Sequence, residues 1–95
     1  MPDVYVITGA GSGFGALAAR ALALQGYTVY AGMYSHTGDF SRYEANAKAF
    51  ASEHSVDLRT VPLDLFKQDS CNAAVKQILS EAGKLDAVIH NAGHM

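Results

Sequence analysis

The chain has 95 residues, of which 49% are hydrophobic, and a formal net charge of -2 at pH 7. These values fit one domain with its own core and lack the basic stripe that would hold a nucleic-acid backbone. No apolar run approaches the roughly 20 residues of a membrane-spanning helix, and the single cysteine excludes an internal disulfide. We therefore expect no nucleic-acid partner, no membrane insertion and, with no charged leader at the N-terminus, a cytoplasmic location.

The first predicted element is a buried parallel strand at Val4–Thr8, which is short, rich in β-branched residues and apolar on both faces. A helix follows. Its apolar residues recur at helical spacing, and Gly26 stands where the helix would stop. The expected buried stripe comprises Leu17, Ala18, Ala21, Leu22 and Leu24.

A second strand is predicted at Thr28–Ala31. The next helix opens on a possible capping box formed by Ser41 and Glu44. One apolar face of this helix comprises Tyr43, Ala47, Phe50 and Ala51.

The third strand is expected at Val56–Leu63, and Asp69 or Ser70 can cap the helix that follows. This helix ends at Gly83, and its apolar stripe is Cys71, Val75, Ile78, Leu79 and Ala82. In this stripe Cys71 is read as a small buried hydrophobe. The last predicted strand is Leu85–His90, with His90 ending a buried strand.

The elements alternate as β-α-β-α-β-α-β. Such alternation predicts the α/β class with a parallel sheet and right-handed crossovers. No linker, repeat or low-complexity segment divides residues 1–95, so we expect a single unit.

Four glycines lie between the first strand and the first helix, at Gly9, Gly11, Gly13 and Gly15. Glycine allows positive φ and close backbone approach, and a helix N-terminus offers unpaired N–H groups to an anion. A bound pyrophosphate therefore explains the cluster better than a merely connecting turn. Residues 11–16 fit G-x-G-x-x-A, whereas residues 8–15 fit T-G-x-x-x-G-x-G and start at the strand end.

In the second register the sequence resembles the short-chain dehydrogenase/reductase family. The matching motifs are T-G-A-G-S-G-F-G at 8–15, L-D-L at 63–65 and H-N-A-G at 90–93, where the family has N-N-A-G. They fall at the ends of the first, third and fourth strands. The resemblance implies a Rossmann-like sheet of strand order 3-2-1-4 that binds NAD or NADP. It covers only the first half of the family's domain, so residues 1–95 are expected to be an N-terminal half truncated after strand four.

The resemblance implies that Gly9, Gly13 and Gly15 form the phosphate loop. Ser12 and Phe14 belong to the same loop, where backbone N–H groups and the Ser12 hydroxyl can reach phosphate or ribose.

The later motifs would complete the adenosine side. Asp64 matches the family's adenine-contacting aspartate, although a turn-capping role is the plainer alternative, and Leu65 adds backbone and apolar surface. Asn91 is expected to pin neighbouring strands, while Ala92 and Gly93 let the ribose lie close to the backbone.

The choice of cofactor depends on the end of the second strand, where an acid selects NAD and a nearby Arg favours NADP. Met33 occupies the acidic position and Tyr34 the basic one, so neither determinant is present. Without a carboxylate to repel a 2′-phosphate, and with donors on Ser35, His36 and Arg42, NADP is favoured over NAD. Tyr34 can stack on the adenine or cover apolar surface.

No catalytic residue is expected in this chain. The family uses a Tyr acid/base followed four residues later by a Lys, and no tyrosine here has that partner. The four histidines show no metal-ligand spacing, so no metal is expected. Two readings remain: the cofactor half of an oxidoreductase, completed elsewhere, or a stand-alone nucleotide-binding or interaction module without turnover.

The fourth strand is expected to form an open sheet edge, because residues 87–89 carry no charge or proline that would discourage pairing. We therefore expect self-association, element swapping or the need for a complementary C-terminal fragment.

Overall fold

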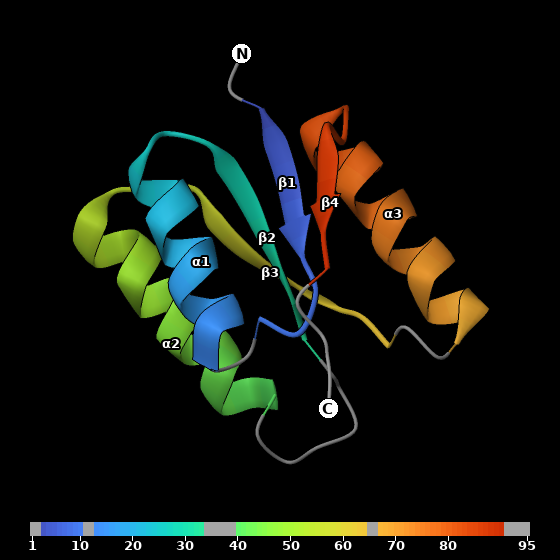
Figure 1. Ribbon diagram of the computed structural model, residues 1–95, viewed down its shortest axis with the longest axis horizontal. Coiled ribbons are helices and arrows are strands. Elements are labelled where there is room, and N and C mark those ends of the chain that lie inside the picture. Colours follow the sequence, from blue (N-terminus) through green and yellow to red (C-terminus); the bar gives the residue numbers. More distant parts are fainter. Residues whose placement is uncertain (1–2, 11–12, 34–39, 65–66, 91–95) are drawn as a thin grey trace.

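The computed structural model describes residues 3–10, 13–33, 40–64 and 67–90. Strands and helices alternate along the chain, as the sequence predicts (Figure 1). The elements are β1 (Val4–Ile7), α1 (Gly13–Leu24), β2 (Thr28–Met33), α2 (Phe40–His54), β3 (Leu58–Pro62), α3 (Gln68–Ala82) and β4 (Ala87–Ile89).

The four strands form one parallel sheet in the order β3-β2-β1-β4. Helices α1 and α2 cover one face of this sheet and α3 covers the other (Figure 1). The predicted Rossmann-like topology is confirmed. Strand β2 runs two residues further than expected, to Met33, whereas the other three strands are shorter than expected.

Each face of the sheet has its own apolar core. Ile7 and Val29 pack under α1 and α2, where small residues such as Ala19, Ala23 and Ala47 allow close helix approach. On the other face, strand residues pack against Ala74 and Ile78 of α3; they are Val4, Val6, Tyr30 and Val61. Burial on both faces explains why β1 and β2 carry no charged residue.

The predicted buried stripe of α1 is partly wrong. Ala18 and Leu22 are half-buried against the core, as expected, but Leu17, Ala21 and Leu24 are exposed. The fully buried side chains are Ala19 and Ala23, which the predicted stripe left out. Alanine and leucine are both apolar, so the pattern alone does not fix which of them faces the sheet. The tight contact with the sheet selects the smaller side chains.

The predicted helix starts also differ from the structure. Helix α2 begins at Phe40, which places Ser41 inside the first turn, and the Glu44 carboxylate accepts a hydrogen bond from the Thr60 hydroxyl at 3.2 Å. Glu44 is therefore tied to β3. Helix α3 begins at Gln68 with Lys67 as its N-cap and no side-chain capping bond, so neither Asp69 nor Ser70 is the cap.

The apolar face of α3 is narrower than predicted. Ile78 is buried, but Val75 and Leu79 are exposed, and Cys71 is half-buried. Their exposure follows from the helix phase, since Ala74 and Ile78 face the sheet and the next residue of each pair lies about 100° around the axis.

Strand β4 lies at the sheet edge, as expected, with Val88 and Ile89 exposed. His90 follows the strand and is itself exposed, so the expectation that it ends a buried strand is wrong. The chain ranges that the structure describes contain no helix long and apolar enough to cross a membrane.

Candidate functional site

The carboxyl ends of all four strands are joined by backbone hydrogen bonds between residues far apart in the chain. The Thr8 N–H donates to the Ile89 carbonyl at 3.0 Å, and the Ala10 N–H donates to the Gly32 carbonyl at 2.9 Å. The Leu63 N–H donates to the Met33 carbonyl at 2.8 Å. The bonds hold the segments that leave the sheet close to one another at the edge where open α/β sheets bind ligands.

The glycine loop begins with a residue that needs glycine. Gly9 has φ of 64°, in the left-handed region, and is exposed directly after the buried Thr8. Ala10 returns to the core, and α1 starts at Gly13. The first N–H groups of α1 have no partner within the helix, so its N-terminus favours a negatively charged group.

The remaining loop residues in the described part differ in exposure. Gly15 is buried, whereas the Phe14 side chain is 83% exposed. The helix backbone at Gly15 is therefore shielded from solvent, while the Phe14 ring at the start of α1 is accessible to solvent. The predicted phosphate contacts of Gly9, Gly13, Phe14 and Gly15 stay predictions, now placed at one helix N-terminus.

Gly32 on β2 is a feature of this edge that the motifs did not reveal. A Cβ atom at this position would lie 2.8 Å from Leu63 Cδ2 and 3.2 Å from the Ile7 carbonyl oxygen. Glycine in a strand commonly marks such a close approach. The absence of a side chain lets Leu63 pack directly across β2, next to the carbonyl that holds the glycine loop.

Asp64 is buried at the exit from β3, with 7% of its surface exposed. Its N–H donates to Ser70 Oγ at 2.8 Å, and its carbonyl accepts from the Lys67 N–H at 3.1 Å. The Cys71 thiol lies 3.7 Å from the same carbonyl. The first turn of α3 therefore fixes the backbone of the residue predicted to contact adenine.

The structure places Asp64 and the glycine loop at the same edge of the sheet. The other predicted site residues lie outside the described ranges, and their roles stay predictions. They are Ser12, Tyr34, Leu65, Asn91, Ala92 and Gly93.

Among the described residues, β2 ends at an apolar side chain. Met33, which the sequence alignment puts at the position of the NAD-selecting acid, is buried in the core. Arg42 lies exposed in the first turn of α2, with its guanidinium carbon 5.2 Å from the centre of the Tyr43 ring. A cation is thus held on the helix that starts after β2.

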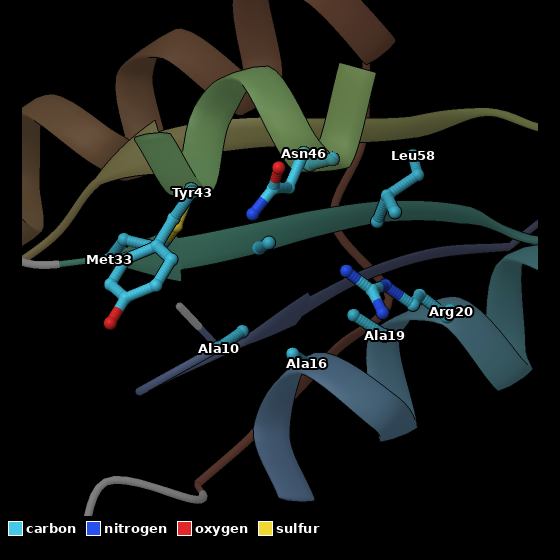
Figure 2. Close-up of a pocket in the computed structure, with 10 residues that line it drawn as sticks. Ala10, Ala16, Ala19, Arg20, Met33, Tyr43, Asn46 and Leu58 are labelled. Atoms are coloured by element: carbon cyan, nitrogen blue, oxygen red, sulfur yellow. The ribbon is translucent and has the colours of Figure 1, made fainter. Parts of the chain in front are cut away.

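A small cavity lies between α1 and α2 over β2 (Figure 2). Figure 2 shows Tyr43 and Asn46 of α2 and Arg20 of α1 around this cavity. The Arg20 guanidinium carbon stands 5.3 Å from the centre of the Phe50 ring. With a volume of about 20 Å³, the cavity has room for about one water molecule and is too small for a nucleotide base.

A polar network joins α3 to the sheet on the opposite face. The fully buried Tyr30 donates its hydroxyl hydrogen to Glu81 at 2.7 Å and accepts a bond from Arg59 at 2.8 Å. Burial and the bond to Glu81 raise the pKa of Tyr30, and the bond to Asp57 raises the pKa of Arg59. Each of these side chains is hydrogen-bonded, and no buried side-chain nitrogen or oxygen among the described residues lacks a partner, so we assign the network to holding α3 in place.

Metal-ligating side chains do not gather within the described part of the chain, where no group of three His, Cys, Asp or Glu could hold an ion. The arrangement brings a helix N-terminus, which in general favours an anion, and a buried carboxylate to one edge of the sheet.

The sequence model described as short chain dehydrogenase matches residues 3–95. A 3-ketodihydrosphingosine reductase of Bacteroides thetaiotaomicron is 35% identical over 92 residues, which are 97% of this chain and 29% of that protein. An NADP-dependent mannitol dehydrogenase of Aureobasidium melanogenum is 33% identical over 95% of this chain and 34% of its own length. The chain spans about a third of the length of these relatives.

Solved structures agree with the fold. An alcohol dehydrogenase from the archaeon Thermococcus sibiricus, complexed with 5-hydroxy-NADP, is 35% identical with a TM-score of 0.79. The alignment covers 93% of this chain and 36% of that one. An NADPH-dependent 3-quinuclidinone reductase from Rhodotorula rubra has a TM-score of 0.77 at 26% identity, over 90% of this chain and 31% of its own.

Proposed function

Because the chain belongs to the short-chain dehydrogenase/reductase family over residues 3–95, we propose that it binds the adenosine diphosphate part of NAD(P)(H). In the complete protein this half would serve hydride transfer between the nicotinamide and a carbonyl or alcohol. The observation that carries the proposal is the convergence of Gly9, the N-terminus of α1 and Asp64 at one sheet edge. A phosphate beside the helix N-terminus and an amino group near the carboxylate match the two ends of an adenosine phosphate.

The nicotinamide site is not part of this proposal, since the family's Tyr and Lys have no counterpart in the sequence. Calorimetric titration of the 95-residue chain with ADP, NAD(H) and NADP(H) tests this division. We expect ADP and NAD(H) to bind weakly and with comparable affinity. A large advantage of NAD(H) over ADP would contradict it, because nicotinamide contacts would then exist.

Gly13→Val tests the phosphate loop. A branched side chain at the first residue of α1 would block close phosphate approach, so ADP affinity should fall. The matched control is Ala21→Val, which adds a branched side chain on the exposed face of the same helix. Retained affinity in a folded Gly13→Val chain would remove the loop from the site.

We further propose that NADP is preferred over NAD, with Arg42 as a donor to the 2′-phosphate. Supporting this are Met33 in place of an acid and the NADP named for the mannitol dehydrogenase and the archaeal alcohol dehydrogenase. Arg42→Gln should reduce the preference for NADP, whereas Lys48→Gln, which removes an exposed cation from the same helix, should not. An unchanged NADP/NAD ratio in Arg42→Gln would refute the assignment.

Turnover by the isolated chain is not expected. General acid–base catalysis by a Tyr is typically worth about 10²–10⁴-fold in rate, and that Tyr is missing. A nicotinamide absorbance assay on purified chain checks this, and activity that follows the 95-residue species through chromatography would overturn it. The alternative function is a stand-alone nucleotide-binding or interaction module in the cytoplasm. This module would use the same binding site, but no second polypeptide segment would supply catalytic residues.

The surface around β4 supports association with further polypeptide, either a second copy or a complementary fragment. Val88 is in register with Val6, on the α3 face, where Leu79 is also exposed. Ile89 is in register with Ile7 and faces the α1 side. An edge with apolar residues on both faces invites pairing. Sedimentation over a wide concentration range tests this, and a monomer at every concentration would contradict self-association.

A further inference from the structure

The backbone of Asp64 is held by α3 rather than by a neighbouring strand. The preceding residue, Leu63, still bonds to β2 through Met33. One residue later, the Asp64 N–H donates to the hydroxyl oxygen of Ser70, six residues ahead, at 2.8 Å. Asp64 therefore stands where the chain passes from the sheet to the helix.

The bonds that join Asp64 to Lys67, Ser70 and Cys71 differ in how much they depend on side-chain identity. The Lys67 bond comes from a backbone N–H, which nearly any residue would supply. The Cys71 thiol at 3.7 Å is a weak donor. Ser70 Oγ accepts at 2.8 Å from an N–H in a buried segment, where an unpaired donor is costly. Among these bonds, the one to Ser70 is therefore the one that a side-chain substitution would change most.

The helix start adds a second observation. Serine in a first turn commonly caps its own helix, but α3 has no side-chain capping bond and takes Lys67 as its N-cap. The Ser70 hydroxyl is directed to Asp64 instead.

We propose that Ser70 is a positioning residue for adenine recognition, holding Asp64 so that its carboxylate reads the exocyclic amino group of the base. The proposal rests on the proposed adenosine site. An orienting bond matters because a recognition group must be fixed within a fraction of an ångström to discriminate. Loss of the hydroxyl would leave Asp64 in place along the chain but free to tilt.

The test compares ADP with inosine diphosphate, which carries a carbonyl where adenine has its amino group. The amino group donates to a carboxylate and the carbonyl does not, so the wild-type chain should prefer ADP. Asp64→Asn and Ser70→Ala should both lower that preference, by roughly tenfold, while inosine diphosphate binds as before. Ser70→Thr, which keeps the hydroxyl, should restore the preference.

Folding is checked by circular dichroism and thermal unfolding of each variant. If Ser70→Ala does not fold, the Ser70→Thr and Ser70→Val pair, which are alike in shape and differ in the hydroxyl, answers the same question. A Ser70→Ala or Ser70→Val chain that keeps the wild-type preference, while Asp64→Asn loses it, overturns the role of Ser70 alone. A wild-type chain that binds neither nucleotide overturns the proposed function and this inference together.

Discussion

Gly32→Ala should destabilise the chain through one identifiable contact. The added Cβ would lie 2.8 Å from Leu63 Cδ2, closer than real Cβ contacts, and 3.2 Å from the Ile7 carbonyl oxygen. Leu63 can move in part, because the contact is with the end of its side chain, but the carbonyl belongs to β1. Overpacking of this kind costs about 1–3 kcal/mol in the free energy of unfolding.

A double-mutant cycle with Leu63→Ala isolates the cause. Removing Cδ2 should relieve most of the clash, so Gly32→Ala should cost less in the Leu63→Ala background, by about 1 kcal/mol or more. Urea unfolding of the four chains measures this, and for a domain of this size each kcal/mol shifts the melting temperature by about 4–8 °C. Equal costs in both backgrounds, or a stabilised Gly32→Ala chain, would refute the reasoning.

Two further outcomes follow from the polar contacts. Tyr30→Phe should lower the free energy of unfolding by about 1 kcal/mol, because Glu81 loses its buried donor. The control is Tyr5→Phe, which removes an exposed hydrogen bond to Asp3 and should cost less. Equal melting temperatures of the two variants would argue against a stabilising role of the network. The Val4 N–H donates to the Asp86 carboxylate at 2.7 Å and lowers the pKa of Asp86. A lowered folded-state pKa means that this contribution is present above the unfolded value of about 4 and is lost as the pH falls through the folded value. Melting temperatures measured across acid pH should therefore decline less steeply for Asp86→Asn than for the wild type, and parallel profiles would contradict the assignment.

The sequence predicts the type and order of every element, because short strand-like runs alternate with segments of helical periodicity. The sequence does not predict which face of α1 is most deeply buried. Leu17 and Leu24 are more hydrophobic than Ala19 and Ala23, yet the alanines are buried. The decisive quantity is the distance between helix and sheet, which is set by the neighbouring strands and does not appear in the local pattern.

The candidate site shows the same division between local and long-range information. The motifs locate Gly9 and Asp64 because a positive φ and a carboxylate are properties of single residues. The hydrogen bonds that hold these segments join pairs of residues that no single motif contains. Ala10 bonds to Gly32, which no motif singles out, and Asp64 bonds to Ser70, which the sequence suggests only as a helix cap.

Gly32 and Ser70 matter for opposite reasons. At Gly32 a missing side chain leaves room for Leu63 and for the Ile7 carbonyl, while the carbonyl of Gly32 itself anchors the glycine loop through the Ala10 N–H. At Ser70 a side chain supplies an acceptor that the sheet no longer provides once β3 has ended. The geometry of the edge therefore depends on one position that must stay empty and one that must carry a hydroxyl. Substitutions at these two positions should disturb nucleotide binding although neither side chain belongs to the phosphate loop or to the acidic motif.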